Sequence, residues 1–386
     1  MIEIQITDWL KEREADMIAL LEKMVNTDSG SYDKPGVDAA GDVLRDFLMG
    51  EGIPVDTIAI ETHGDALRAT VAAPGQSGNR PILLMGHRDT VFSQGEASRR
   101  PFTIKNGRAY GPGVADMKAG LVMNAFLLAA FAKFGGAPAP LVGLFTGDEE
   151  IGSPTSRPHI EAEAGTACAV FNSEPGRPAG NIVTGRKGGV FFRCEVTGRA
   201  AHSGANFGDG ISAIEELARK IQAWHTLTSL DAGQTVNVGL IKGGQSVNTV
   251  APLATCEIDV RYIEPADRDG IVTKITEVAE ACSVAGASAS LSIIGEFRPM
   301  KQSKAAKGLF DQYAQNAKQA GLDVAGEFSG GCADSGFAAA LGAPTLCGVG
   351  PVGGLVHSPD EYLEVATIVP RAQAIALTIL KLQTSG

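Results

Sequence analysis

Residues 141–150 read LVGLFTGDEE, an apolar run of strand length followed by a Gly and three consecutive acids. A buried parallel strand appears in a sequence as such an apolar run, and α/β sheets place their chemistry just beyond the carboxyl ends of the strands. Three adjacent carboxylates repel one another unless a cation holds them. Two interpretations are open at this point: an ordinary acidic turn on the surface, or an acidic site at the end of a strand.

Length and composition set the first limits. A chain of 386 residues predicts two domains, and 44% hydrophobic with 20% charged residues is ordinary for a globular protein with a sizeable core. The formal charge of −11 argues against nucleic acid or an anionic membrane as the main partner. An anionic small substrate would need a local cluster of Arg or Lys.

The N-terminus and the cysteines predict a cytoplasmic protein. Residues 1–5 (MIEIQ) lack the basic and apolar regions of a signal peptide, although an export signal cleaved earlier would leave the same sequence. No stretch approaches the roughly 18 apolar residues that we expect of a membrane span. The six cysteines are scattered without a CxxC pair, which favours buried free thiols in a reducing compartment.

Strands alternate with helices in the first part of the chain. Strand-like runs are expected at 55–60, 66–73, 81–85, 141–145 and 167–171, with helical patterns at 8–25, 37–49 and 116–134. The same alternation resumes from about residue 302. This order predicts an α/β domain whose largely parallel sheet is covered on both faces.

The pattern changes near residue 183. Period-two strands and two amphipathic helices follow in the order strand-helix-strand-strand-helix-strand, which is ferredoxin-like. We therefore predict a discontinuous domain made of 1–182 and 300–386, with an α+β domain inserted at 183–299.

Five residues with metal-binding side chains stand at strand ends or helix starts. Taken singly, each residue is weak evidence, because a helix N-cap is the commoner explanation for Asp116 and a lone histidine is usually structural. Together His87, Asp116, Glu150, Glu174 and His357 suit two divalent ions of the zinc, cobalt or manganese kind, with one carboxylate bridging them. Two adjacent glutamates cannot both point at one ion, so one of the pair would bind metal and the other would act as general base.

Five ordered motifs make the chain recognisable. They stand at 86–91 (GHRDTV), 110–118 (YGPGVADMK), 146–153 (TGDEEIGS), 174–175 (EP) and 357–362 (HSPDEY). Over essentially its whole length the chain resembles the M20 family of metallopeptidases and amidohydrolases. Within that family it is most similar to glutamate carboxypeptidases of the carboxypeptidase G2 kind.

The resemblance implies a role for each of these residues. His87 and Glu174 would hold one metal, Glu150 and His357 would hold the other, and Asp116 would bridge them. Glu149 would be the general base, and Asp89 would orient His87 from behind. The family also implies a cis peptide bond between Asp116 and Met117.

The inserted domain resembles the lid of the family, which often forms a dimer interface. His202, in the segment 198–204 (GRAAHSG), would reach an active site, commonly that of the partner subunit, and stabilise the oxyanion. Asn248, Arg261 and Arg298 would clamp a substrate carboxylate, although Arg261 reads equally well as a solvated arginine. Segment 329–335 departs from the Gly-rich substrate loop of the family at Cys332 and Ala333, which leaves specificity open.

The resemblance implies a metal-dependent hydrolase with two divalent ions, zinc first and manganese or cobalt as alternatives. It would cleave the amide bond to a C-terminal, glutamate-like amino acid, or the amide of an N-acyl amino acid, with water activated by Glu149. The alternatives are an acetylornithine or succinyl-diaminopimelate type of deacylase, a hydrolase of an unusual aromatic amide or amine, and a non-enzymatic metal or peptide binder. The expected partners are a small molecule or short peptide with a free carboxylate and a second copy of the chain, with no nucleic acid and no membrane.

Overall fold

The computed structural model describes residues 1–75 and 78–383, which form two compact units. The first unit holds Met1–Arg186, Met300–Ser329 and the chain from Ala333 onward, and the second holds Lys187–Pro299 with Gly330–Cys332. The first boundary falls four residues after the predicted one, because strand β8 (Ile182–Arg186) belongs to the sheet of the first unit.

An eight-stranded sheet forms the centre of the first unit, in the order β1-β2-β6-β3-β7-β14-β8-β13. Its central strands β6, β3 and β7 are parallel and buried at every residue, as expected for a sheet covered on both faces. The predicted α/β fold with a mostly parallel sheet is confirmed. The strands are β1 (Val55–Ile58), β2 (Ala66–Val71), β3 (Ile82–His87), β6 (Leu141–Thr146), β7 (Ala169–Asn172), β8, β13 (Gly326–Ser329) and β14 (Thr345–Cys347).

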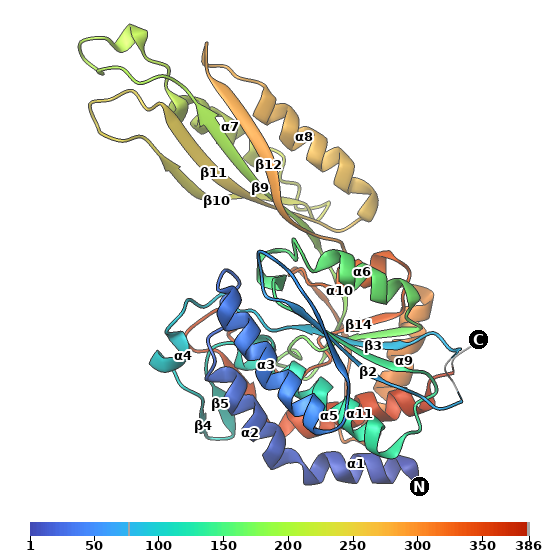
Figure 1. The fold of residues 1–386 in the computed structure, drawn as a ribbon. Helices are drawn as coiled ribbons and strands as arrows, with labels where there is room; N and C mark the ends of the chain where they lie inside the picture. Colours follow the sequence, from blue (N-terminus) through green and yellow to red (C-terminus); the bar gives the residue numbers. More distant parts are fainter. Residues whose placement is uncertain (76–77, 384–386) are drawn as a thin grey trace. The chain divides into compact units, whose positions relative to one another are not determined.

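Helices cover both faces of this sheet, with α5 and α11 on one face and α6 and α10 on the other (Figure 1). The apolar faces of α1, α2, α3, α5, α9 and α11 contribute to one continuous core. The helices are α1 (Ile2–Glu12), α2 (Glu14–Val25), α3 (Lys34–Gly50), α4 (Glu96–Arg99), α5 (Ala119–Phe134), α6 (Arg157–Thr166), α9 (Lys304–Gln319), α10 (Ser335–Ala340) and α11 (Ile368–Lys381).

Two expected helices differ from the structure. The helix predicted from residue 8 to 25 starts at Ile2 and breaks at Arg13, whose guanidinium lies 4.9 Å from the ring centroid of Trp9 and 3.1 Å from Glu51. The helix predicted from Asp116 becomes regular only at Ala119, because Asp116 and Met117 have non-helical backbone angles. In both places long-range contacts override the local pattern.

Residues Val114–Phe134 are long and apolar enough to cross a membrane by length and composition alone, so the expectation that no stretch approaches a span is wrong. Of the apolar window, 94% is buried inside the protein. This segment contains the central core helix of the first unit.

A small sheet that the sequence did not predict joins distant loops of the first unit. Its order is β15 (Gly353–Gly354), β16 (Tyr362–Glu364), β5 (Arg108–Tyr110) and β4 (Thr103–Lys105), with antiparallel pairing throughout. Strand β5 leads into the turn of Asp116, and His357 lies between β15 and β16. The sheet therefore ties two regions of predicted metal ligands together.

The second unit is a ferredoxin-like α+β fold, as predicted. Its antiparallel sheet has the order β10-β11-β9-β12, and the buried residues of α7 and α8 share one core with alternate residues of β9 and β11. The elements are β9 (Gly188–Thr197), α7 (Ala213–His225), β10 (Thr235–Gly243), β11 (Leu253–Tyr262), α8 (Arg268–Glu280) and β12 (Ser288–Phe297).

Helix α5 approaches the turn after β7 so closely that only glycine fits. A Cβ on Gly120 would lie 2.0 Å from the backbone O of Ser173, the residue before Glu174. We expect Gly120→Ala to destabilise the protein by about 1–3 kcal/mol through overpacking, seen as a lower thermal unfolding midpoint. Gly308→Ala, inside α9 with no neighbouring atom within 4 Å, is the matched control and should stabilise by up to about 1 kcal/mol. A midpoint for Gly120→Ala at or above that of the unmodified protein would contradict this packing.

Candidate metal centre and active site

The predicted ligands meet at the carboxyl edge of the sheet in the first unit. His87 ends β3, the acidic triplet follows β6, and Glu174 lies two residues beyond β7. These three strands are parallel neighbours, so their ends lie side by side. Asp148 is fully buried and Glu149 is 7% exposed, which excludes the surface-turn interpretation of the triplet.

Two groups of ligand atoms share Asp116. One group is His87, Asp116 and Glu174, and the other is Asp116, Glu150 and His357; within each, the atoms lie within 4.8 Å of one another. His87 Nε2 is 3.3 Å from Asp116 Oδ1 and 3.8 Å from Glu174 Oε1. His357 Nε2 is 3.3 Å from Asp116 Oδ2 and 3.1 Å from Glu150 Oε2.

These separations fit divalent ions. Ligand atoms 2.0–2.2 Å from a tetrahedral zinc lie about 3.4 Å apart. In the part of the chain that the structure describes, His87 Nε2, Asp116 Oδ1 and Glu174 Oε1 are buried without a hydrogen-bond partner, which is rare for buried polar atoms. Burial, together with the charge of Asp116, raises the pKa of Glu150 to about 7. Bound cations would give the unpartnered ligand atoms a partner and would favour the ionised form of Glu150. The residues therefore fit a dinuclear centre in which Asp116 would bridge two ions.

Asp89 couples the metal ligands to the acidic turn. His87 Nδ1 lies 3.0 Å from the backbone O of Asp89 and 3.4 Å from its Oδ1, so Nδ1 donates there and Nε2 faces the ligand group. The carboxylate also accepts the backbone N–H groups of Glu149 and Glu150, each at 3.1 Å. The residue therefore fixes the tautomer of the histidine and the direction of the turn.

Glu149 lies beside the ligand groups, with its Oε2 3.9 Å from His87 Nε2. Burial raises the pKa of Glu149 well above its usual value, and the charges of Glu174 and Asp334 add to this against the opposing effect of His87. A buried carboxylate with raised proton affinity can take up a proton near neutral pH and return it. The position suits the general base that the sequence analysis assigned to this residue.

Asp148, for which the sequence indicated no role, holds the acidic turn in place. Its Oδ2 accepts hydrogen bonds from the N–H of Thr155 at 2.7 Å, from the Thr155 hydroxyl at 2.5 Å and from the N–H of Ser156 at 3.1 Å. Nearby, Asp334 accepts a hydrogen bond from Ser153, and burial with the charge of Asp148 raises the pKa of Asp334 to about 8. Only the position of Asp148 two residues beyond β6 would have indicated a site.

Glu361 anchors the turn that carries Asp116. Its carboxylate accepts the backbone N–H groups of Gly113 (3.2 Å), Ala115 (2.9 Å) and Asp116 (3.0 Å). The peptide bond between Asp116 and Met117 is cis, as the resemblance implied. Glu361 lies in the motif at 357–362, but the sequence did not indicate this role, because its partners lie about 245 residues away.

In the second unit, the structure brings His202 and Asn248 together on neighbouring exposed loops. Ser203 N–H donates to the backbone O of Asn248 at 3.0 Å, and His202 forms an isolated bridge with Thr249. His202 Nδ1 accepts the N–H groups of Gly204 and Ala205, each at 3.1 Å. The neutral ring therefore carries its proton on Nε2, which can donate outward.

Both predicted arginines already have acidic partners. Arg261 lies on β11, where Nε and Nη2 bind the two carboxylate oxygens of Asp259 at 2.7 and 3.0 Å and Nη1 lies 2.6 Å from Cys332 Sγ. Arg298 follows β12, with Nη1 3.4 Å from Glu296 Oε1. The thiol that departs from the family pattern therefore contacts a predicted substrate-binding residue.

Two groups of candidate metal ligands that share Asp116, with a buried glutamate beside them at the carboxyl edge of the sheet, are typical of a metal-dependent hydrolase. Residues 83–381 match the model of peptidase family M20/M25/M40, and the chain belongs to this family. It is 30% identical to carboxypeptidase G2 of Pseudomonas sp. (strain RS-16) over 96% of the chain and 90% of that protein. It is 25% identical to acetylornithine deacetylase of Erwinia tasmaniensis over 96% of the chain and 98% of that protein.

Solved structures share the fold. The M20 family metallo-carboxypeptidase Sso-CP2 of Sulfolobus solfataricus superimposes with a TM-score of 0.78 at 17% identity, covering 94% of this chain and 98% of that one. A tripeptidase of Staphylococcus aureus gives a TM-score of 0.73 at 21% identity, covering 95% and 97%.

We expect Glu361→Gln to weaken metal binding, because the amide can no longer accept with both oxygens from the turn of Asp116. Loss of such an outer contact typically costs 10–100-fold in metal affinity. Titration with zinc in competition with a chelator measures this. Glu364→Gln, three residues further along at the end of β16 and paired with exposed Arg108, is the matched control and should bind as the unmodified protein does. Equal affinities for both variants would remove Glu361 from the support of the centre.

Proposed function

We propose that this protein hydrolyses the amide bond between an acyl group and an amino acid that keeps a free carboxylate, as an N-acyl-amino-acid amidohydrolase or carboxypeptidase. The observation that carries the proposal is the pair of ligand groups sharing Asp116, with Glu149 buried beside them. The names of two relatives, a carboxypeptidase and an acetylornithine deacetylase, support amide chemistry at an amino acid.

Two divalent ions, when bound, would supply Lewis-acid polarisation of the carbonyl and a lowered pKa for the attacking water. His87 and Glu174 would hold one ion, Glu150 and His357 the other, and Asp116 both. Zinc is the first candidate, with manganese or cobalt as alternatives.

Glu149 performs the proton transfers. It removes a proton from the water whose oxygen attacks the amide carbon, which gives a tetrahedral oxyanion. Glu149 then returns that proton to the amide nitrogen as the C–N bond breaks, leaving a carboxylic acid and an amine. Asp89 maintains the geometry by holding the N–H groups of Glu149 and Glu150.

The second unit would contribute binding groups. His202 has a free Nε2 donor suited to a developing oxyanion, in its own subunit or in a partner. Asn248, Arg261 and Arg298 would bind the free carboxylate, with substrate competing for guanidinium groups that Asp259 and Glu296 now hold. A homodimer through this unit and a cytoplasmic location are part of the same proposal.

Glu149→Gln should lower kcat by at least about 10²–10⁴-fold while metal content stays unchanged, because the amide cannot accept a proton. The assay is mass-spectrometric detection of products from a panel of N-acyl amino acids that varies the acyl and amine halves separately, run with zinc and then with manganese or cobalt. The same panel distinguishes carboxypeptidase, acetylornithine-type deacylase and aromatic-amide specificities.

Glu161→Gln is the matched control, since Glu161 pairs with Arg157 on the surface of α6. Turnover of Glu149→Gln equal to that of the control would refute the general base. If metal-loaded protein hydrolysed no member of the panel, the proposed function would be wrong.

A further inference from the structure

A cavity of about 420 Å³ adjoins the metal centre within the first unit. Three segments line this cavity, which is open to solvent on one side: residues 30–33 between α2 and α3, residues 90–94 after β3, and Glu150 with Ile151. Glu150 is therefore both a predicted metal ligand and part of the wall of the cavity. The volume of the cavity lies within the range of ordinary small-molecule sites.

The walls of this cavity are fixed to the metal site. Ser31 N–H donates to the backbone O of Thr90 at 3.2 Å, and Thr90 N–H donates to Ser29 at 2.8 Å. Ser31 Oγ donates to Asp89 Oδ2 at 2.7 Å, and the same carboxylate holds the turn of Glu150. A group bound in the cavity would therefore keep a fixed position relative to the reacting carbonyl.

A close approach between the loop of Gly30 and the loop of Phe92 defines the shape of the cavity. A Cβ on Gly30 would lie 2.5 Å from the backbone O of Phe92, so glycine lets the two loops touch. The ring of Phe92 lies 4.7 Å from the guanidinium of Arg100, which is paired with Glu96. The aromatic wall is therefore braced from outside.

The lining selects against anions and favours apolar groups. Tyr32, Val91, Phe92 and Ile151 supply aromatic and aliphatic surface, and the charged lining residues are Asp33 and Glu150, both acids. Among the described residues of the lining there is no Lys or Arg. A substrate carboxylate would be repelled here, which leaves the cavity to the acyl half of the substrate.

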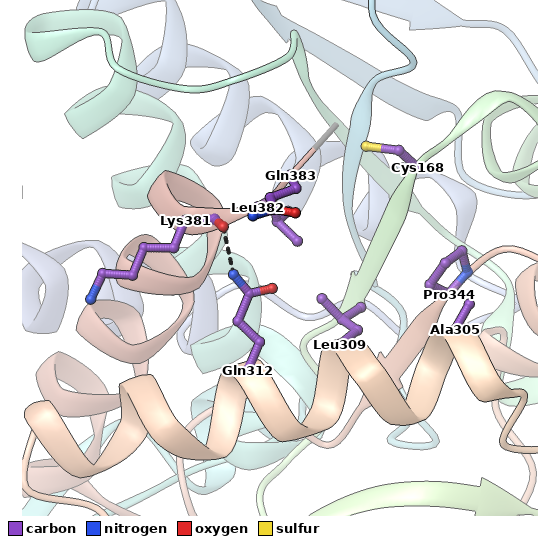
Figure 2. A pocket seen from close by; sticks show the side chains of 8 residues that line it. All are labelled: Cys168, Ala305, Leu309, Gln312, Pro344, Lys381, Leu382 and Gln383. Atoms are coloured by element: carbon purple, nitrogen blue, oxygen red, sulfur yellow. Dashed lines mark hydrogen bonds between the residues drawn. The ribbon is translucent and has the colours of Figure 1, made fainter. Parts of the chain in front are cut away.

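Two other cavities of the first unit have linings that, among the described residues, include none of the candidate metal ligands. One, of about 340 Å³, lies between the start of α9 and the end of α11, where Gln312 donates to the backbone O of Lys381 at 2.6 Å (Figure 2). Another, of about 460 Å³, is lined by α2 and α3 with charged residues at its rim. Neither can receive part of a substrate held at Asp116 and Glu150.

We propose that the cavity at Tyr32, Val91 and Phe92 binds the acyl group of the substrate, and that this group is an apolar aryl or medium-length alkyl chain larger than acetyl. The inference rests on the proposed amide hydrolysis and adds its acyl specificity. An acetyl group would leave most of the volume empty, whereas each further buried methylene should raise kcat/KM by roughly fourfold.

Filling the cavity tests the assignment. Val91 is 45% exposed, so Val91→Trp should fold normally and place an indole in the space meant for the acyl group. On acetyl, butyryl, hexanoyl and phenylacetyl derivatives of one amino acid, the unmodified protein should prefer the larger groups. Val91→Trp should lower kcat/KM for hexanoyl and phenylacetyl at least 10-fold more than it lowers kcat/KM for acetyl. Ala305→Trp, which places the same side chain at the cavity of Figure 2, is the matched control and should leave the series unchanged.

Calorimetric binding of the free acids acetate, hexanoate and phenylacetate to the zinc-loaded protein gives a second readout that needs no turnover. Hexanoate and phenylacetate should bind more tightly than acetate, and Val91→Trp should remove that difference. Tyr32→Ala should weaken phenylacetate binding, whereas Tyr32→Phe should retain it.

Hydrolysis with rates independent of acyl size would overturn the acyl site while the proposed function stands. Absence of hydrolysis would contradict the proposed function, and binding of the free acids would still test the acyl site. Equal affinities of hexanoate and phenylacetate for the unmodified protein and for Val91→Trp would overturn the acyl site.

Discussion

The structure depends on one electrostatic constraint, the concentration of carboxylates at the buried carboxyl edge of a parallel sheet. Asp116, Glu150 and Glu174 meet there with His87 and His357, and the atoms of Asp116 belong to both ligand groups. Burial and mutual repulsion raise the pKa values of Glu150 and Glu174. Cations bound between these carboxylates would compensate the repulsion, and the carboxylate of Asp116 would contact two of them.

Around this centre the remaining acids serve the backbone. Asp89 accepts the N–H groups of Glu149 and Glu150, Asp148 accepts those of Thr155 and Ser156, and Glu361 accepts three from the turn of Asp116. Each of these carboxylates satisfies backbone N–H groups in a short segment that connects a strand to a helix. The acids thus divide into candidate metal ligands and residues that position the loops bearing those ligands. Asp89 also accepts a hydrogen bond from Ser31, which lines the cavity beside Glu150.

The fold and the grouping of the candidate ligands were predictable from sequence because their signals are local. His87, Glu150 and Glu174 each follow an apolar strand, and five motifs in order identify the family. The roles of Glu361 and Arg13 escaped prediction because their partners, Ala115 and Glu51, are distant in sequence. Periodicity also failed at Asp116, where bonds to Glu361 hold a turn in place of the first helical turn, and at β15, a strand of two residues without an apolar pattern.

Metal stoichiometry tests the shared role of Asp116 most directly. Inductively coupled plasma mass spectrometry on zinc-loaded, desalted protein should give two ions per chain for the unmodified protein and close to one for Glu174→Gln, which removes a ligand from only one group. Asp116→Asn should retain less than one ion, because both groups lose the same carboxylate, while circular dichroism shows an intact fold. Two ions retained by folded Asp116→Asn would contradict a centre built on a shared carboxylate.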